Sequence, residues 1–234
     1  MHSFTFGGIN SANLGVYISG SGVFTAPERS YEFIEVPGRD GELLGPVMRL
    51  SNVMVTYPCF FYGDLTDKAT ELKSKLLSVM GYATLTDTYD TDRFRKAVFT
   101  GGTQFKANKR LDTAEFELEF SCKPQRWLNS GLAVTTLLTD GSITNPTLFP
   151  SQPLITVYGY GDLYIGSQRI TINDVFDSIS IDCEMGDCYS GVENGNSVVE
   201  LQSNEFPTLA PGANAISFDN TITKVEITPR WYEL

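Results

Sequence analysis

The sequence contains few side chains that could carry out catalysis. His2, close to the N-terminus and expected to be mobile, is the only histidine, so a Ser-His-Asp triad or a Cys-His dyad has a single candidate base. A G-x-S-x-G elbow, a Walker loop and a G-x-G-x-x-G turn after a strand are all absent from the sequence. We therefore predict no catalytic residues and no cofactor, and we expect a protein that is not an enzyme.

The four cysteines give little indication of metal or redox chemistry. Cys59, Cys122, Cys183 and Cys188 are spread along the chain without a C-x-x-C pair. Zinc sites built from cysteine and histidine need ligand pairs at close spacing, and Cys183 with Cys188 is the one near pair. We predict that all four are reduced, buried and packed as small hydrophobic residues.

Acidic residues in the second half raise two further possibilities. A pair among Asp182, Glu184 and Asp187 could in principle cleave a glycosidic bond, but such residues are equally typical of the solvent face of a strand. The turns around Asp174, Asp177 and Asp187 offer oxygen ligands for calcium, yet the spacing of an EF-hand is absent. We predict no metal site.

One loop differs from its surroundings. Residues 36–41 read Val36-Pro37-Gly38-Arg39-Asp40-Gly41, which places a proline, two glycines and an Arg-Asp pair within six residues. The composition predicts a turn with glycines at positive φ. A rigid turn with adjacent opposite charges also suits docking to a neighbouring subunit. Both interpretations, a plain turn and a contact site, stay open at this point.

Charge is divided unevenly along the chain. The whole chain has 17 basic and 28 acidic residues, a net charge of −11. Residues 1–130 hold 14 basic and 15 acidic side chains (net −1), and residues 131–234 hold 3 and 13 (net −10). This asymmetry predicts two folding units. The second is expected to repel nucleic acid and anionic lipid, and a plain solubilising surface explains the same acidic charge. We expect no sequence-specific binding of nucleic acid.

The bulk composition is that of a globular protein. At 234 residues, with 41% apolar and 19% charged residues, the chain is expected to form one or two domains. No apolar run of about 18 residues exists, which predicts that no segment spans a membrane. Residues 1–16 lack the basic cluster and apolar core of a secretory signal, so we expect folding in the cytosol where the chain is made.

Residue patterns in the first half predict β-structure around one helix. Strands are expected at 53–61, where alternate residues are apolar, at 96–99, and at 113–122, where apolar residues alternate with glutamates. After the first of these strands, apolar residues recur at steps of three and four, which predicts an amphipathic helix over about 66–80. Asp64 or Thr66 is the expected cap and Gly81 the stop, and the apolar stripe consists of Leu65, Ala69, Leu72, Leu76 and Met80.

The second half reads as a β-sandwich. Breakers and prolines between residues 131 and 153 predict a rigid, extended connection, which leaves domains over 1–130 and 154–234. About seven short strands without helical periodicity favour a sandwich. The expected strands are 154–158, 163–165, 170–172, 179–183, 198–201, 215–218 and 224–229.

The order and spacing of short motifs resemble one known family, the distal tail protein of long, non-contractile-tailed bacteriophages. The match extends over nearly the whole chain, and its most distinctive run is Val36–Gly41. In the first half the other motifs are Phe4-x-Phe-x-Gly7, Ser11, Leu14-Gly15, Arg29-x-x-Glu32, Gly81-Tyr82-x-x-Leu85-x-Asp87, Tyr89-Asp90, Phe94-Arg95-Lys96-Ala97 and Phe120-Ser121-Cys122-Lys123-Pro124-Gln125. In the second half they are Asn145-Pro146, Pro153, Ile181-Asp182-Cys183, Phe206-Pro207-x-Leu-x-Pro-Gly212 and Pro229-Arg230-Trp231.

The resemblance implies a structural role at the tip of a phage tail. It implies that residues 1–130 form a domain related to tail-tube subunits, which closes into a hexameric ring, and that residues 154–234 form a galectin-like β-sandwich facing outward. The implied partners are the tail tube protein, the tail-associated lysin or central fibre protein, and a receptor-binding protein, with DNA passing through the ring. The protein is then expected in the virion tail tip or baseplate, after assembly in the host cytoplasm. Val36, Gly38, Arg39, Asp40 and Gly41 are the expected subunit-interface residues.

Two features leave the mode of host attachment open. The chain has no room for the inserted carbohydrate-binding module of some longer family members, and no protruding arm is evident from the sequence. An alternative function is a lectin-like module, in which Tyr158, Tyr160 and Tyr164 of the second domain bind host-surface glycans. Strand packing explains the same tyrosines, because a fold by itself does not imply sugar binding.

Overall fold

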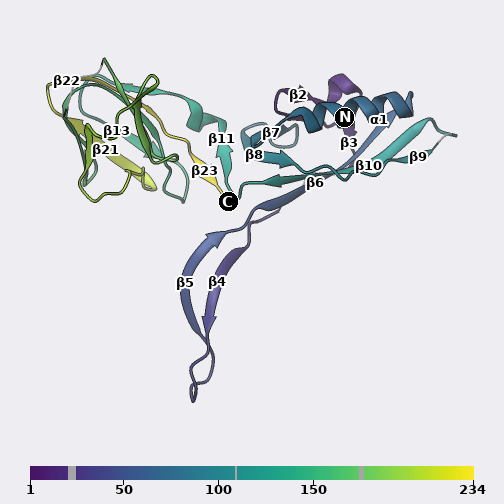
Figure 1. Cartoon of the computed structure of the whole chain (residues 1–234), viewed down its shortest axis with the longest axis horizontal. Coiled ribbons are helices and arrows are strands. Elements are labelled where there is room, and N and C mark those ends of the chain that lie inside the picture. Colours follow the sequence, from purple (N-terminus) through teal and green to yellow (C-terminus); the bar gives the residue numbers. More distant parts are fainter. Residues whose placement is uncertain (21–24, 109, 174–176) are drawn as a thin grey trace. The chain divides into compact units, whose positions relative to one another are not determined.

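The computed structural model describes residues 1–20, 25–108, 110–173 and 177–234, with the backbone alone at 46–48. The chain folds as two units, residues 1–126 with Leu234 (unit 1) and residues 127–233 (unit 2) (Figure 1). Strands dominate both units, and α1 is the one α-helix among the described residues. The predicted class, mainly β with one helix and a C-terminal sandwich, is confirmed.

Unit 1 contains one large antiparallel sheet, one helix and a separate two-stranded sheet. The strand order of the large sheet is β2-β1-β7-β8-β10-β6-β3, with β9 on β10, and β4 pairs with β5. The elements are β1 (Phe4–Phe6), β2 (Ile9–Asn10), η1 (Ser11–Leu14), β3 (Tyr17–Ile18), β4 (Arg29–Ile34), β5 (Leu43–Leu50), β6 (Val53–Tyr62), α1 (Leu65–Ser78), β7 (Ala83–Asp87), β8 (Arg93–Phe99), β9 (Lys106–Asn108) and β10 (Thr113–Cys122).

The centre of the large sheet follows from the alternation of residues in β6 and β10. The two strands pair without interruption from Thr113 opposite Tyr62 to Cys122 opposite Val53. Every second residue is buried in each strand, as predicted from the sequence. Together with residues of β1, β3, β7, β8 and α1 they form the hydrophobic core of unit 1.

The helix is shorter than the sequence predicted. It ends at Ser78 rather than at residue 80, because Val79 is extended (φ −81°, ψ 109°) and Gly81 has a positive φ of 73°. Leu72 and Leu76 are buried as expected, whereas Met80 is 90% exposed and does not belong to the apolar stripe. Asp64 occupies the N-cap position, but its side chain makes no capping hydrogen bond.

Unit 2 is a β-sandwich of two antiparallel sheets that share one hydrophobic core. The sheets have the orders β12-β22-β14-β17-β18-β19 and β13-β21-β15-β16-β20, and β11 pairs with β23. The elements are β11 (Arg126–Leu128), η2 (Asn129–Leu132), β12 (Thr135–Leu137), β13 (Gly141–Asn145), β14 (Leu154–Gly159), β15 (Gly161–Ile165), β16 (Gln168–Ile172), β17 (Ile179–Asp182), β18 (Asp187–Ser190), β19 (Glu193–Asn194), β20 (Val199–Leu201), β21 (Gly212–Phe218), β22 (Ile222–Thr228) and β23 (Tyr232–Glu233).

The predicted connection over residues 131–153 needs correction. This segment contains β12, which pairs with β22, and β13, which pairs with β21, so it forms part of both sheets of the sandwich. The prolines lie in the loop that follows β13. The side chain of Asn145 is buried there and forms hydrogen bonds with backbone groups of this loop and of Leu209. Its Nδ2 donates to the carbonyl oxygens of Phe149 and Leu209, each at 2.9 Å, and its Oδ1 accepts from the amide of Thr147 at 2.9 Å. The boundary between the units lies at residues 126 and 127, a few residues before the predicted boundary at 130.

In the described part of the chain, no helix has the length and apolar character that crossing a membrane requires.

Candidate assembly interface

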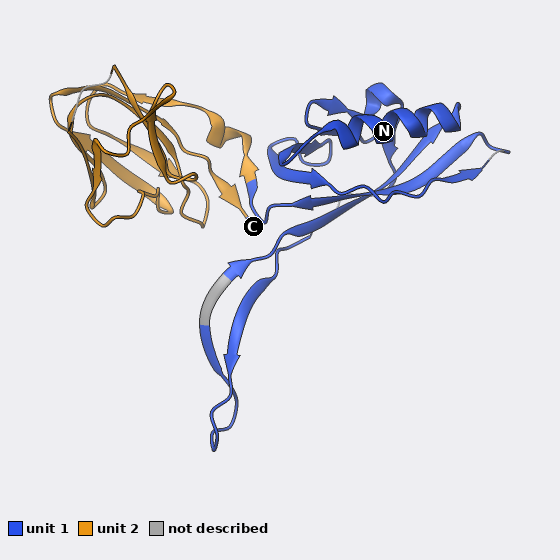
Figure 2. Ribbon diagram, in the orientation of Figure 1, with its two compact units in different colours: residues 1–126, 234 blue, residues 127–233 orange. Residues whose placement is uncertain are grey.

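The two-stranded sheet of β4 and β5 is an arm of unit 1. Figure 2 shows it projecting as a ribbon from the rest of that unit. Every residue from 28 to 44 is exposed to solvent, and the pairing of the strands is irregular near Tyr31. An isolated pair of strands buries too little surface to be stable on its own. The sequence did not make an arm evident, and the structure corrects that expectation.

Large apolar side chains are exposed on this arm. Phe33 in β4 lies opposite Leu44 in β5, and each is 61% exposed. Ile34 lies opposite Leu43, with 44% and 38% exposed, and the rings of Tyr31 and Phe33 are 6.3 Å apart. Grouped exposed apolar residues are typical of a surface that contacts another protein.

The tip of the arm is the predicted turn at residues 36–41. The amide of Arg39 donates to the carbonyl oxygen of Val36 at 3.1 Å, which closes a β-turn with Pro37 and Gly38 at its centre. Gly38 has a φ of 81° and Gly41 a φ of 76°, so the prediction of glycines at positive φ is confirmed. A proline followed by a glycine of positive φ is the arrangement of a type II turn.

The charged residues of the tip are available to a partner. Arg39 and Asp40 are both exposed, and neither has an ion pair with any residue that the structure describes. The geometry thus places Val36, Gly38, Arg39, Asp40 and Gly41 together at the end of the arm. Their assignment to a subunit interface stays a prediction.

The large sheet of unit 1 has a second exposed surface, on the side of β10 that faces away from the core. Glu115, Glu117 and Glu119 are exposed there, and they lie opposite Phe60, Pro58 and Thr56 of β6. The buried side of the same strands packs in the core with Leu72 and Leu76 of α1. The acidic face predicted from the alternation in residues 113–122 is confirmed.

His2 has a structural environment. Its ring stacks on Tyr89 with centroids 4.0 Å apart, and its Nδ1 lies 3.2 Å from Oγ1 of Thr88. Its backbone forms a β-bridge with Ile18. Residues far along the chain thus contact this segment, although the sequence predicted a mobile terminus.

All four cysteines are free and buried, as predicted. Burial raises the pKa of Cys59 to about 12 and that of Cys122 to about 11. Burial, together with the charge of a neighbouring aspartate, raises the pKa of Cys183 to about 12 and that of Cys188 to about 11. At neutral pH these side chains are protonated thiols, which are poor nucleophiles and poor metal ligands.

The carboxylates considered for catalysis are part of the fold. Asp182 is 4% exposed, and both of its oxygens accept hydrogen bonds from the guanidinium of Arg230, at 2.7 and 2.9 Å. Burial alone would raise the pKa of Asp182, but the bonds from Arg230 and from the amides of Met185 and Glu184 outweigh it and hold the pKa below its ordinary value. Asp182 is therefore not the solvent-facing residue that the strand pattern predicted.

The acidic turns do not come together as a metal site in the described residues. Asp187 accepts a hydrogen bond from Nδ2 of Asn196 at 2.6 Å. Asp174 lies outside the residues that the structure describes. Among those it does describe, no group of three or more His, Cys, Asp or Glu side chains is placed to hold a metal ion.

The tyrosines of the glycan-binding alternative do not form one stacking surface. Tyr158 belongs to the six-stranded sheet and Tyr164 to the five-stranded sheet. The hydroxyl of Tyr158 donates to Glu226 at 3.1 Å, and Nζ of Lys224 lies 3.7 Å from the centre of its ring. The hydroxyl of Tyr164 donates to Asp162 at 3.1 Å. Tyr158 and Tyr164 are half-buried, whereas Tyr160 is 47% exposed.

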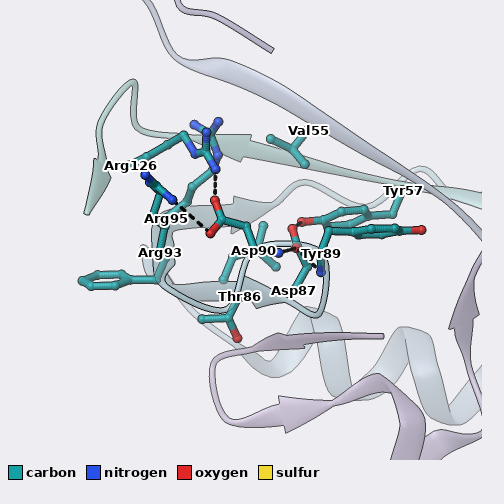
Figure 3. Close-up of a pocket in the computed structure, with 11 residues that line it drawn as sticks. Val55, Tyr57, Thr86, Asp87, Tyr89, Asp90, Arg93, Arg95 and Arg126 are labelled. Carbon is teal, nitrogen blue, oxygen red and sulfur yellow. Dashed lines mark hydrogen bonds and ion pairs between the residues drawn. The ribbon is translucent and has the colours of Figure 1, made fainter. Parts of the chain in front are cut away.

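Sequence reasoning missed a cluster of arginines in unit 1. Figure 3 shows the carboxylate of Asp90 between two guanidinium groups. Arg93 lies 3.3 Å from Asp90 Oδ1, and Arg126 binds Oδ2. Arg95 lines the same pocket, and burial, together with the positive charge of Arg126, lowers its pKa. Sequence analysis noted Asp90 and Arg95 only as parts of two family-like motifs. Their spacing along the chain matches no known binding motif, so it did not indicate that they lie in one pocket.

The second carboxylate of this pocket belongs to Asp87. Its Oδ2 accepts a hydrogen bond from the hydroxyl of Tyr57 at 2.6 Å, and its Oδ1 accepts from the amides of Tyr89 and Asp90, each at 3.0 Å. Burial, with the adjacent Asp87 charge, raises the pKa of Tyr57 well above its ordinary value. These bonds fix the loop between β7 and β8.

The protein thus consists of two β units. The cysteines and Asp182, which could have taken part in chemistry, are buried in the fold, and an exposed apolar arm is suited to contact with another chain. No protein-family model matches the sequence, and no curated protein matches it. Solved structures, however, match over nearly the whole chain.

The Dit protein of phage SPP1, described as a paradigm of the hub adsorption apparatus in phages that infect Gram-positive bacteria, matches with a TM-score of 0.76. The match covers 100% of both chains at 10% sequence identity. Chains of the phage P2 baseplate in its activated conformation, with Ca and with Sr, match with TM-scores of 0.54 and 0.50 at 10% and 9% identity. They cover 97% of this chain, and 97% and 98% of their own lengths. The chain thus has the fold of phage tail hub and baseplate proteins, which confirms the resemblance at the level of the fold.

Proposed function

We propose that this protein is the structural hub of a phage tail tip. The observation that carries the proposal is the agreement of fold with the SPP1 Dit hub protein over the full length of both chains. Because the agreement includes both units, it supports a common two-unit architecture and not merely one domain in common. In this proposal the protein acts by assembly and not by catalysis, and it is located in the tail tip or baseplate of the virion after assembly in the host cytoplasm.

In the proposed assembly, unit 1 forms a hexameric ring and the galectin-like unit 2 faces outward. A closed ring requires one surface of each copy to contact a different surface of the next copy. The arm supports this role, because Phe33 and Leu44 are exposed in unit 1 although they are large and apolar. At its tip, Val36, Gly38, Arg39, Asp40 and Gly41 form the proposed subunit contact, in which the opposite charges of Arg39 and Asp40 set the register.

The ring joins the tail tube protein to the tail-associated lysin or central fibre protein and to a receptor-binding protein, and DNA passes through it. The low number of basic residues in unit 2 agrees with the absence of sequence-specific nucleic-acid binding.

The experiment that tests the proposal is photo-crosslinking of the full chain. A photoreactive amino acid replaces Leu44 in the arm, and a matched sample carries it at Leu148, an 86% exposed residue of unit 2. We expect position 44 to yield a ladder of covalent species that ends at the hexamer, and position 148 to yield mainly monomer. A ladder that continues beyond the hexamer, or equal ladders from both positions, contradicts the proposed ring.

A second set of variants tests the arm itself. Phe33→Ser combined with Leu44→Ser is expected to remove the ladder when the crosslinker is placed at Val36, while Leu148→Ser leaves it unchanged. Native mass spectrometry gives an independent reading of the same species. A hexamer that persists in the double variant contradicts the assignment of the interface to the arm.

A further inference from the structure

Glycine follows an aspartate or an asparagine at three places in the chain, and such a pair can react with itself. The pairs are Asp40-Gly41 in the arm, and Asp140-Gly141 and Asn194-Gly195 in unit 2. Because glycine has no Cβ, its backbone nitrogen can approach Cγ of the preceding side chain and close a five-membered ring. The reaction requires rotation of the backbone between the two residues, so it depends on how firmly the fold holds each pair.

In the first pair of unit 2 the side chain is held. Oδ1 of Asp140 accepts a hydrogen bond from the amide of Phe218 at 3.1 Å. Gly141 is the first residue of β13 and pairs with Ile216 of β21. Its surroundings are closely packed, because a Cβ built on it would lie 2.9 Å from Cδ2 of Leu137. This part of the sheet must therefore open before the ring can close.

In the second pair of unit 2 the nitrogen itself is held. The amide of Gly195 donates to the carbonyl oxygen of Cys188 at 2.8 Å, and Oδ1 of Asn194 accepts from the amide of Asn196 at 3.0 Å. Gly195 is buried, and a Cβ built on it would overlap Cδ1 of Ile179. The nucleophile is thus hydrogen-bonded and enclosed, so this pair also needs local opening.

The pair at the tip of the arm lacks these restraints. Asp40 and Gly41 are both exposed and lie in a bend between β4 and β5. No described residue donates a hydrogen bond to the carboxylate of Asp40 or accepts one from the amide of Gly41. The space beside Gly41 is open, since a Cβ built on it would meet no described atom within 4 Å. The nitrogen of Gly41 can therefore reach Cγ of Asp40 while both units stay folded.

We propose that Asp40-Gly41 is a site of spontaneous isomerisation in the unassembled chain. The nitrogen of Gly41 attacks Cγ of the protonated carboxyl group, a C–N bond forms, and the hydroxyl group leaves with the amide proton as water. Water then opens the resulting succinimide at either carbonyl group. Opening at the former main-chain carbonyl yields isoaspartate, in which the backbone runs through Cβ and Cγ of residue 40 and the mass of the chain is unchanged.

The modification alters the arm where the proposed subunit contact lies, and this consequence rests on the proposed hub function. The backbone between Arg39 and Gly41 becomes longer by one atom, and the free carboxylate is attached directly to Cα of residue 40. The spacing of the two opposite charges changes, so an isomerised arm no longer fits the next copy. An arm covered in the ring is protected, because the contact restricts the rotation that ring closure needs.

The first test compares the three pairs within one sample of the full chain. The chain is incubated at neutral pH, folded at a concentration where it is monomeric and unfolded in guanidinium chloride, and isoaspartate is located by peptide mapping with electron-transfer fragmentation. We expect Asp40 to isomerise at similar rates in both samples. Asp140 and Asn194 should react at least about tenfold more slowly in the folded sample, because local opening limits them. If folding slows the reaction of Asp40 as strongly as that of Asp140, the proposal is overturned.

Asp40→Glu is the control variant for this measurement. It keeps the negative charge, but its longer side chain would have to close a six-membered ring, which forms far more slowly. We expect no isomer at residue 40 in this variant, while the unfolded sample still shows isoaspartate at Asp140. An isomerised peptide from the arm that persists in the variant assigns the reaction to another residue and contradicts the proposal.

The second test relates the modification to assembly. A partly isomerised sample is allowed to assemble, hexamer and monomer are separated by size, and isoaspartate at residue 40 is measured in each. We expect enrichment in the monomer, and we expect Asp40→Glu to assemble equally well before and after the same incubation. Equal isoaspartate in the two fractions overturns the effect on assembly. A fresh chain that forms no hexamer contradicts the hub proposal instead, and the first test alone then decides the isomerisation.

Discussion

Two antiparallel strand pairs of unit 1 have similar compositions and opposite environments. In β6 and β10, alternate residues are buried over the whole pairing, and the side chains of both strands enter one core. In β4 and β5 every described residue up to Leu44 is exposed, although Tyr31, Phe33 and Ile34 lie within six residues. Apolar side chains stabilise a monomer only when the rest of the chain covers them. The arm therefore exposes apolar side chains that the described part of the chain does not cover, as the proposed contact with another chain requires.

The C-terminal segment of unit 2, in contrast to the arm, is irregular in structure but is held by hydrogen bonds within its own unit. Residues 229–231 have little regular structure, yet Arg230, at a positive φ of 57°, binds the buried Asp182 through two hydrogen bonds. The amide of Arg230 also donates to the carbonyl oxygen of Gly131 at 2.8 Å. This segment has an anchor inside its own unit, which the arm lacks.

Removing a core side chain from the β6–β10 pair is expected to produce the largest effect. Phe120 is fully buried, and its ring lies 5.1 Å from that of Phe6 and 5.5 Å from that of Phe99. Phe120→Ala should lower the free energy of unfolding of unit 1 by about 3–5 kcal/mol, because it removes apolar contacts and leaves a cavity. Hydrogen exchange of the amides of β6 and β10 measures the change.

Glu119→Ala, on the opposite face of β10, is the control for this variant and should change the stability by less than about 0.5 kcal/mol. If both variants destabilise unit 1 equally, the two faces of the sheet do not differ as the comparison requires.

Removing the anchor of unit 2 is expected to have the next largest effect. Asp182→Asn leaves the guanidinium of Arg230 without its buried counter-charge and should lower the stability of unit 2 by about 2–4 kcal/mol. Trp127 and Trp231, the two tryptophans of the chain, both lie in unit 2, so tryptophan fluorescence during chemical denaturation follows that unit.

Glu193→Gln, at an exposed acid of unit 2, is the matched control and should leave the fluorescence midpoint in place. A midpoint that Asp182→Asn does not move shows that the C-terminal segment is held by other contacts.

The same anchor predicts a dependence on pH. The pKa of Asp182 is below its ordinary value in the folded protein, so its contribution to stability is present above the unfolded pKa of about 3.9 and is lost as pH falls through the folded pKa. The fluorescence midpoint of unit 2 should therefore decrease as pH falls below about 4. Asp182→Asn should show a smaller decrease over that range, and equal decreases in both proteins assign the effect to other acids.

The smallest effect on the isolated chain is expected in the arm. Phe33→Ser and Leu44→Ser remove two exposed side chains and should change the stability of the monomer by less than about 0.5 kcal/mol. Thermal unfolding at a concentration where the chain is monomeric measures this. A loss of several kcal/mol in the monomer is inconsistent with an arm that is exposed until it meets another chain.

The match between prediction and structure is closest where the pattern is local. The alternation in 113–122 predicted both bounds of β10 and its buried face, since a strand places successive side chains on opposite sides. The proline and glycines of residues 36–41 predicted the turn at the tip of the arm, because their backbone preferences act within a few residues. The strands predicted between 154 and 229 correspond to β14, β15, β16, β17, β20, β21 and β22.

The residue pattern alone therefore indicated the helical or strand periodicity of each segment, the lack of catalytic motifs and the burial of the four thiols. The fold was needed to show that Asp182 binds Arg230, 48 residues away, that Arg93, Arg95 and Arg126 line one pocket with Asp90, and that residues 131–153 complete the sandwich. The physical reason is the range of the interactions: periodicity reflects neighbours along the chain, whereas ion pairs and sheet edges depend on which distant strands lie side by side. The arm belongs to the second group, because exposure is a property of the whole fold.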